Sequence, residues 1–150
     1  MPAESVLAPA GPADLDALLP MLERFNAGEG IAFDPAVARH ALGELLARPE
    51  LGRVFRIVEA GATVGYGALT FGWSLEWVGR DAFSDEIYLE PPQRGRGLGR
   101  TALRALMDEA RALGVRALHL EVERSNTRAQ SVYRMAGFVD RQLFLMTRRL

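Results

Sequence analysis

Three glycines and three arginines share one short loop of the chain, Gln93-Arg94-Gly95-Arg96-Gly97-Leu98-Gly99-Arg100, which we call the glycine loop. The loop follows a strand-like run and a pair of prolines, and a strongly periodic helical segment begins inside it. The first amides of a helix have no acceptor within the helix, and the helix dipole gives them a partial positive charge. Glycines let a ligand approach such amides closely. The glycine loop therefore predicts a site for phosphate oxygens, with a plain glycine-rich turn as the alternative.

Two other kinds of phosphate-binding loop do not fit this sequence. A Walker loop needs a lysine after its last glycine, and every one of the 18 basic residues of the chain is an arginine. A dinucleotide-binding fingerprint has a different glycine spacing and comes early, after the first strand of a βαβ unit. The arginines themselves indicate no ligand, because a GC-rich genome also produces a chain rich in Ala, Gly, Pro and Arg.

Helical periodicity indicates the elements that position the glycine loop. Apolar residues recur every three or four positions in four segments. Asp34 and Pro35 have the pattern of an N-cap and a first helical residue, so the second helix is expected to begin there. Gly114 is expected to end the helix that follows the loop. The expected helices cover residues 14–26, 34–48, 98–113 and 127–135.

Between the helices lie short runs with the composition and alternation of strands. Residues 72–82, which include both tryptophans, are expected to be irregular. The resulting order, β-α-α-β-β-β-α-β-α-β, predicts one α/β domain of residues 1–150 with a mixed sheet. The expected strands cover residues 6–8, 54–58, 63–71, 86–89, 117–122 and 138–147, the last segment forming one or two strands.

Composition narrows the function classes further. The chain has 150 residues, of which 49% are hydrophobic and 25% charged, as in ordinary globular proteins. No apolar run approaches the ~18 residues of a membrane span, and no secretory signal is visible. The net charge of −1 argues against a nucleic-acid partner. No cysteine is present, and the acidic pairs lack the histidine partners of a zinc site. We therefore expect a cytoplasmic protein with no metal, nucleic-acid or membrane partner.

The glycine loop is one of several motifs that follow each other in a familiar order. Before it stands the run Asp85-Glu86-Ile87-Tyr88-Leu89-Glu90-Pro91, and after it come residues 120–129 and the run Tyr133-Arg134-Met135-Ala136-Gly137-Phe138. In this order they resemble the GNAT superfamily of N-acetyltransferases, whose acyl-CoA signature is similar to Arg94-x-x-Gly97-x-Gly99. The resemblance covers the element order from residue 4 to 150. It implies a mixed, mostly antiparallel sheet of six to seven strands, flanked by about four helices, whose fourth and fifth strands splay apart.

The same resemblance implies acetyl-CoA as the co-substrate, with its pantetheine arm between the splayed strands. Backbone groups of Tyr88, Leu89 and Glu90 would pair with the pantetheine amides as an added strand does. Asn126 would contact the CoA arm, and its place before Thr127 also makes it a candidate helix N-cap. The pyrophosphate would bind to Arg94, Gly95, Arg96, Gly97, Leu98, Gly99 and Arg100.

The reaction implied is the attack of a neutral amine on the thioester. Tyr133 stands at the family's general-acid position, where it would contact the sulfur and protonate it; an aromatic residue packed on the sheet is the alternative. The base is expected among Asp85, Glu86 and Glu121. Strand alternation would put Asp85 and Glu86 on opposite faces. His119 is expected to be structural.

The acceptor site is expected to be built from the loop that joins the first two helices and from the irregular segment after the third strand. The acidic and aromatic side chains of these segments would suit a cationic amine. The run from Asp85 to Leu89 resembles the branch that modifies polyamines and similar small amines. A protein N-terminus or side chain is the alternative acceptor, and a non-catalytic acyl-CoA-binding module is the alternative function. The resemblance also implies a homodimer. The residues expected to line the acceptor site are Glu29, Phe33, Trp73, Glu76, Trp77 and Glu86.

Overall fold

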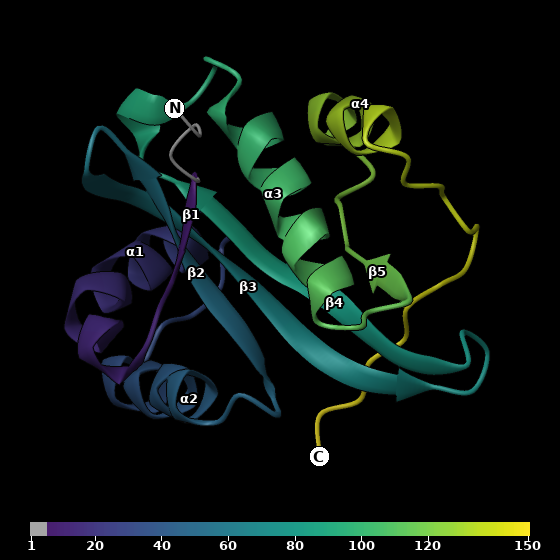
Figure 1. Cartoon of the computed structure of the whole chain (residues 1–150), viewed down its shortest axis with the longest axis horizontal. Helices are drawn as coiled ribbons and strands as arrows, with labels where there is room; N and C mark the ends of the chain where they lie inside the picture. The colour runs from purple at the N-terminus through teal and green to yellow at the C-terminus, as the bar shows by residue number, and fades with distance from the viewer. Residues whose placement is uncertain (1–5) are drawn as a thin grey trace. The chain divides into compact units, whose positions relative to one another are not determined.

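The computed structural model describes residues 6–150, so residues 1–5 of the expected domain lie outside the described residues. The chain forms two compact units, Met1–Leu120 and Glu121–Leu150. The first unit contains a sheet and three α-helices, and the second contains one α-helix and the C-terminal segment (Figure 1). Within the described residues no helix is both long and apolar enough to cross a membrane.

The sheet has five strands, which lie in the order of the sequence. Neighbouring strands pair antiparallel, except that the last two run parallel. The expectation of a mixed, mostly antiparallel sheet is confirmed, whereas the expected six to seven strands are too many. The strands are β1 (Leu7–Pro9), β2 (Gly52–Glu59), β3 (Ala62–Ser74), β4 (Gly79–Leu89) and β5 (Ala117–His119).

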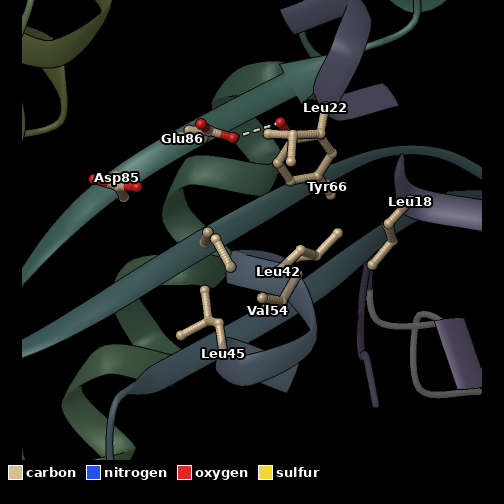
Figure 2. Close-up of a pocket in the computed structure, with 10 residues that line it drawn as sticks. Leu18, Leu22, Leu42, Leu45, Val54, Tyr66, Asp85 and Glu86 are labelled. Atoms are coloured by element: carbon tan, nitrogen blue, oxygen red, sulfur yellow. Dashed lines mark hydrogen bonds between the residues drawn. The ribbon is translucent and has the colours of Figure 1, made fainter. Parts of the chain in front are cut away.

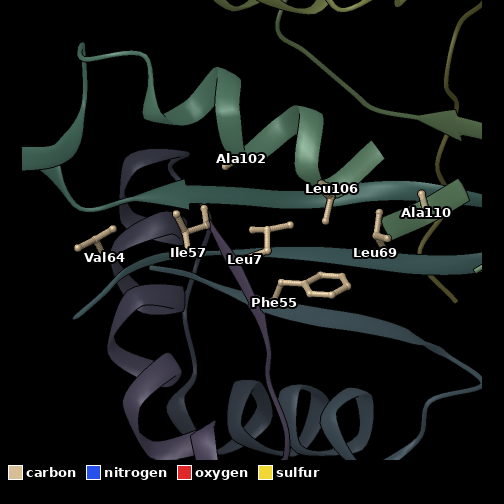
Figure 3. Close-up of a cluster of buried hydrophobic side chains, with 8 residues drawn as sticks. All are labelled: Leu7, Phe55, Ile57, Val64, Leu69, Ala102, Leu106 and Ala110. Carbon is tan, nitrogen blue, oxygen red and sulfur yellow. The ribbon is translucent and has the colours of Figure 1, made fainter. Parts of the chain in front are cut away.

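Helices cover both faces of this sheet. On one face α1 (Leu15–Gly28) and α2 (Pro35–Ala47) pack through Leu18, Met21 and Leu46 against Val54, Tyr66, Ala68 and Tyr88. On the other face α3 (Leu98–Ala112) presents Ala102, Leu106 and Ala110, which share one side of the helix at helical spacing. Figure 3 shows these side chains over the strands. Their partners in this second core are Leu7, Phe55, Ile57, Val64 and Leu69.

Two helix starts follow from capping side chains. The Asp34 carboxylate accepts hydrogen bonds from the amides of Ala36 and Val37 at 3.0 and 3.2 Å, ahead of Pro35. In the second unit the Asn126 side chain accepts one from the Ala129 amide at 3.1 Å, at the start of α4 (Thr127–Met135). Both N-caps are confirmed, and such a cap contributes about 1 kcal/mol. The four expected α-helices are present, with two short 3₁₀ helices, Pro12–Asp14 and Pro91–Gln93.

The expectation that residues 72–82 are irregular is wrong. β3 continues to Ser74 and β4 begins at Gly79, so that Gly72 lies opposite Asp81 and Trp73 opposite Arg80. The turn between them is closed by the Trp77 amide, which donates to Ser74 Oγ at 3.0 Å. Gly, Asp and Arg have little intrinsic preference for strands, and the pairing between two long strands overrides that preference.

The C-terminal strands are also corrected. β5 ends at His119 instead of Val122, and within the described residues 138–147 form no strand. Gln142 has a φ of 55°, in the left-handed region, which interrupts any extended run through that segment. The sheet therefore stops at β5.

Candidate active site

A β-bulge in β4 determines where the acidic residues point. Ala68 lies opposite Glu86 while the next residue, Leu69, lies opposite Ser84, so that Asp85 is an extra residue in β4. Because a bulge breaks the strict alternation of side chains, Asp85 and Glu86 can face the same side. Both line one pocket, as Figure 2 shows. The expectation that they occupy opposite faces is wrong for this reason.

This pocket, which we call the carboxylate pocket, has a volume of about 140 Å³. It lies between α1, α2 and the face of the sheet that these helices cover. Most of its wall is apolar, and its polar side-chain groups are the Tyr66 hydroxyl and the two carboxylates. The lining residues are Leu18, Leu22, Ala41, Leu42, Leu45, Val54, Tyr66, Ala68, Asp85 and Glu86.

Tyr66 and Glu86 form a direct hydrogen bond in the pocket. The Tyr66 hydroxyl donates to Glu86 Oε2 at 2.5 Å. Burial raises the pKa of Glu86, the bond from Tyr66 lowers it, and the charge of Asp85 raises it again, with a net rise. Partial loss of hydration also raises the pKa of Asp85, although Asp85 is an exposed residue. Carboxylates with raised pKa values are stronger bases, which suits removal of a proton from an ammonium ion.

Beyond the bulge, β4 has one open edge. Its parallel pairing with β5 ends where Phe83 lies opposite His119, yet β4 continues to Leu89. The Glu90 amide donates to Val64 O at 2.8 Å, toward β3. Backbone groups alternate along a strand, so those of Ile87 and Leu89 point to the open edge and those of Tyr88 point to β3.

Of the three residues expected to pair with pantetheine, only Leu89 therefore has its backbone groups at this edge. Ile87 was missed from the sequence, because only the strand register reveals which groups are already paired. The Leu89 carbonyl accepts a hydrogen bond from Arg94 Nε at 2.9 Å. The Glu90 carboxylate is held from two sides, by Arg24 at 2.5 Å and by the Tyr88 hydroxyl at 3.2 Å.

The glycine loop presents a row of free amides. Gly95 and Gly97 have φ values of 77° and 85°, in the left-handed region, and Gly97 is the N-cap of α3 with no side-chain cap. The first amide bonded back to the loop is that of Thr101, which donates to Gly97 O at 3.2 Å. Within residues 6–150, the amides from Gly95 to Arg100 donate no hydrogen bond. The Arg94 amide differs, because it donates to Pro91 O at 3.2 Å.

The three arginines of the loop have different surroundings. The guanidinium of Arg94 lies 5.4 Å from the centre of the Tyr88 ring, above the end of β4. Arg96 forms an ion pair of 3.0 Å with Glu59 at the end of β2. Arg100 is exposed and forms no ion pair with the described residues, so its guanidinium is available to a ligand.

Three of the expected site residues belong to the second unit. Tyr133 is half-buried on α4, and its ring meets that of Phe138 edge-on with 6.0 Å between centroids. Asn126 caps the same helix. Glu121 is exposed and follows the end of β5, so it is not a strand residue as expected.

The residues expected to line the acceptor site do not converge on the pocket. Glu29 and Phe33 lie in the loop between α1 and α2, and Trp77 lies in the turn between β3 and β4. Trp73 is seven residues beyond Tyr66 on β3, or roughly 23 Å at the usual rise per residue, and is 76% exposed. Only Glu86 of the expected set lines the pocket. The leucines of α1 and α2 that line the pocket were not named from the sequence as site residues, because the bulge that turns the two acids toward them is visible only in the strand register.

His119 has the structural environment expected for it. Its Nε2 lies 3.1 Å from Asp81 Oδ2, and its ring packs 5.2 Å from that of Phe83. Among the described residues, no three His, Cys, Asp or Glu side chains come together in a way that could hold a metal ion.

Comparisons with known proteins identify the family of the chain. The model of the acetyltransferase (GNAT) family matches residues 21–138. An IAA acetyltransferase of Azospirillum brasilense is 32% identical over 130 residues, which cover 86% of this chain and 81% of that protein. Thialysine N-epsilon-acetyltransferase of Bos taurus is 35% identical over 77 residues, which cover 51% of this chain and 45% of that protein.

A solved structure matches almost the whole chain. The integron cassette protein HFX_CASS3 from the mobile metagenome of Cole Harbour Salt Marsh has a TM-score of 0.85 and 34% identity. The match covers 97% of this chain and 90% of that one. The chain belongs to the acetyltransferase (GNAT) family and is an acyl-CoA-dependent N-acetyltransferase.

Proposed function

We propose that the chain transfers the acetyl group of acetyl-CoA to the primary amine of a small molecule bound in the carboxylate pocket. The observation that carries this proposal is the bulge at Asp85, which turns two carboxylates into one pocket. These acids lie just past Phe83, where β4 loses β5 as its partner. An amine held by the carboxylates would therefore stand beside the strand edge that is open to a thioester arm.

The donor would bind along the open edge and the glycine loop. The backbone groups of Ile87 and Leu89 would pair with the pantetheine amides, for which Arg94 would release the Leu89 carbonyl. The free amides from Gly95 to Arg100 would hold the pyrophosphate, because helix N-terminal amides favour anions. Arg100 would add a positive charge there, and Arg96 could do so after leaving Glu59.

The carboxylates would make the amine reactive. An ammonium ion has no free electron pair, so Glu86 or Asp85 would first take one proton from it, directly or through water. The free amine would then bond to the carbonyl carbon of the thioester, and the carbon–sulfur bond would break. We assign to Tyr133 the protonation of the departing thiolate. The carboxylate releases the first proton to solvent, and the second proton lost by the nitrogen restores the Tyr133 hydroxyl through water, so the products are an amide, the CoA thiol and one proton.

Several features support a small acceptor. The carboxylate pocket is closed on two sides by α1 and α2, and its volume of about 140 Å³ is that of a small organic group. The bovine relative is named for the acetylation of a small molecule, thialysine. Glu121 stays a third candidate for the base, and Asn126 a candidate contact of the CoA arm. The proposal also treats residues 1–150 as one catalytic domain.

The direct test is release of free thiol from acetyl-CoA by the purified chain, with an amine panel at mildly alkaline pH. The panel should contain monoamines, a polyamine, amino acids and a peptide with a free N-terminus, and mass spectrometry should identify each acetylated product. Glu86→Gln should lower kcat by about 10²-fold or more. Glu23→Gln is the matched control, because Glu23 is exposed on α1 and does not line the pocket.

Two results would decide between this function and the alternatives. If only the peptide is acetylated, the acceptor is a protein. If acetyl-CoA raises the melting temperature but no amine releases thiol, the chain is a binding module. The cytoplasmic location and the homodimer stay predictions, to be checked by cell fractionation and by light scattering in solution.

A further inference from the structure

The wall of the carboxylate pocket is strongly divided between an apolar and an acidic part. Leucines from α1 and α2, with Val54 and Ala68 of the sheet, form the apolar part. Asp85 and Glu86 on β4 form the acidic part, with the Tyr66 hydroxyl already bonded to Glu86. A ligand that fills the pocket must therefore carry its positive charge at one end and be apolar along the rest.

The pocket offers no partner to a negative group on the ligand. Among residues 6–150, neither an arginine nor a histidine lines it. An amino acid bound by its amine would bring its own carboxylate near those of Asp85 and Glu86, without a cation to balance it. Like charges at such short distances repel strongly in a partly buried site. Amino acids are therefore disfavoured as acceptors.

A second ammonium is disfavoured for a related reason. The second amine of a polyamine would extend among Leu18, Leu42 and Leu45, which carry no hydrogen-bond acceptor. Burial of a charged group without a partner is costly, because the water it loses is not replaced. A spermidine-like chain would have to bend out of the pocket or leave it unfilled.

The size of the pocket limits the apolar group. An apolar cavity of about 150 Å³ is large enough to bind benzene, and the carboxylate pocket has about 140 Å³. A phenyl ring or a branched alkyl group of similar size would fill the apolar part while its aminomethyl end reaches Glu86. Larger ring systems would exceed the volume of the pocket.

We propose that the acceptor is an apolar monoamine, in which one primary amine is joined to a phenyl-sized or branched alkyl group. This inference rests on the proposed function and names its substrate class. It separates this chain from a polyamine acetyltransferase and from an enzyme that acetylates amino acids. Leu22, on the wall contributed by α1, is a specificity-determining residue in this account.

The test compares kcat/KM across matched amines with the full chain and acetyl-CoA. From ethylamine to isoamylamine, kcat/KM should rise about fourfold for each CH₂ that becomes buried. The kcat/KM for 2-phenylethylamine should exceed those for spermidine, 1,5-diaminopentane and lysine by at least about tenfold, which corresponds to ~1.4 kcal/mol. Saturation-transfer NMR should detect bound 2-phenylethylamine in the presence of CoA, which gives a readout independent of turnover.

Leu22→Glu tests the apolar wall, and Leu75→Glu is its matched control. The change adds a carboxylate for a second ammonium, so the variant should prefer 1,5-diaminopentane to isoamylamine and reverse the wild-type order. Leu75 is 91% exposed in the turn between β3 and β4 and should tolerate the same substitution without effect. Circular dichroism and the melting temperature identify a variant that fails to fold, in which case Leu42→Ala, expected to admit larger aryl amines, replaces it.

The outcomes separate the inference from the function beneath it. Thiol release that is fastest with spermidine or lysine, or a Leu22→Glu variant that keeps the wild-type order, would overturn the apolar monoamine and leave the acetyltransferase function intact. Absence of thiol release with every amine, while acetyl-CoA still binds, would overturn both.

Discussion

The Tyr66 hydroxyl donates a 2.5 Å hydrogen bond to Glu86 Oε2 across neighbouring strands. Glu86 lies opposite Ala68, two residues from Tyr66, so the two side chains are diagonal neighbours on one face of the sheet. Tyr66 is 4% exposed, and burial next to the charge of Glu86 raises the pKa of its phenol far above the usual value. The phenol therefore acts as a fixed donor, which orients the carboxylate that we propose as the base.

Loss of this donor should change the pH dependence of the reaction. The bond from Tyr66 lowers the pKa of Glu86 against the effect of burial, so Tyr66→Phe should raise that pKa. The acidic limb of the pH profile of kcat/KM should then move to higher pH. Tyr88→Phe is the control, because its hydroxyl bonds to Glu90 instead of Glu86. An acidic limb that stays in place in Tyr66→Phe would exclude Glu86 as the titrating base.

Glu86 should also reduce the stability of the free enzyme at neutral pH. The pKa of Glu86 is raised in the folded chain. Its contribution to the free energy of unfolding is therefore most favourable below the pKa that Glu86 has in the unfolded chain, and it is lost as the pH rises through the pKa in the folded chain. Glu86→Gln should therefore have a higher melting temperature than the wild type at neutral pH. The gain should shrink as the pH falls toward about 4, near the unperturbed value for a glutamate. Glu23→Gln should show no such pattern.

The helices and the glycine loop could be predicted from the sequence because their signals are local. The Asp34 cap, the leucine spacing of α1 and α2, and the proline break before the loop each lie within a few residues of the element they define. The extent of the sheet was harder to predict from the sequence. The ends of β3, β4 and β5 depend on the neighbouring strand with which each one pairs, and that strand can lie dozens of residues away in the sequence.

The candidate site was predictable only in its residue types. The sequence indicated Asp85 and Glu86 as acids of interest, but alternation assigned them to opposite faces. Because β4 has one extra residue relative to β3, both acids line the same pocket. This extra residue can be recognised only from the pairing of Ala68 with Glu86 and of Leu69 with Ser84. Trp73 and Trp77, which were expected at the acceptor site, do not line the carboxylate pocket, because they belong to the far end of a hairpin that looked irregular.

Gly97→Glu should abolish binding of acetyl-CoA. The substitution places a side chain and a negative charge at the N-terminus of α3, and the left-handed φ of 85° adds roughly 1–2 kcal/mol of strain. Isothermal titration calorimetry measures the affinity. Gly114→Glu is the matched control, since Gly114 follows the other end of α3 with a φ of 79° and open space around it. If Gly97→Glu binds acetyl-CoA as tightly as the control does, the glycine loop is not the pyrophosphate site.

Tyr133→Phe should lower kcat by about 10²-fold while the affinity for acetyl-CoA changes little. The variant keeps the ring and its edge-on contact with Phe138, and loses the hydroxyl whose proton is proposed for the leaving thiolate. Steady-state kinetics and calorimetry on the same preparation separate the two effects. An equal loss of rate and of affinity would make Tyr133 a structural residue.

The most direct measurement is a crystal structure of the chain with CoA bound. We expect pyrophosphate oxygens within hydrogen-bond distance of the amides from Gly95 to Arg100, and pantetheine amides paired with Ile87 and Leu89. The thiol should end beside the mouth of the carboxylate pocket, near Asp85 and Glu86. A CoA molecule whose pyrophosphate lies away from the glycine loop, or whose thiol points away from these two carboxylates, would contradict the proposed donor site.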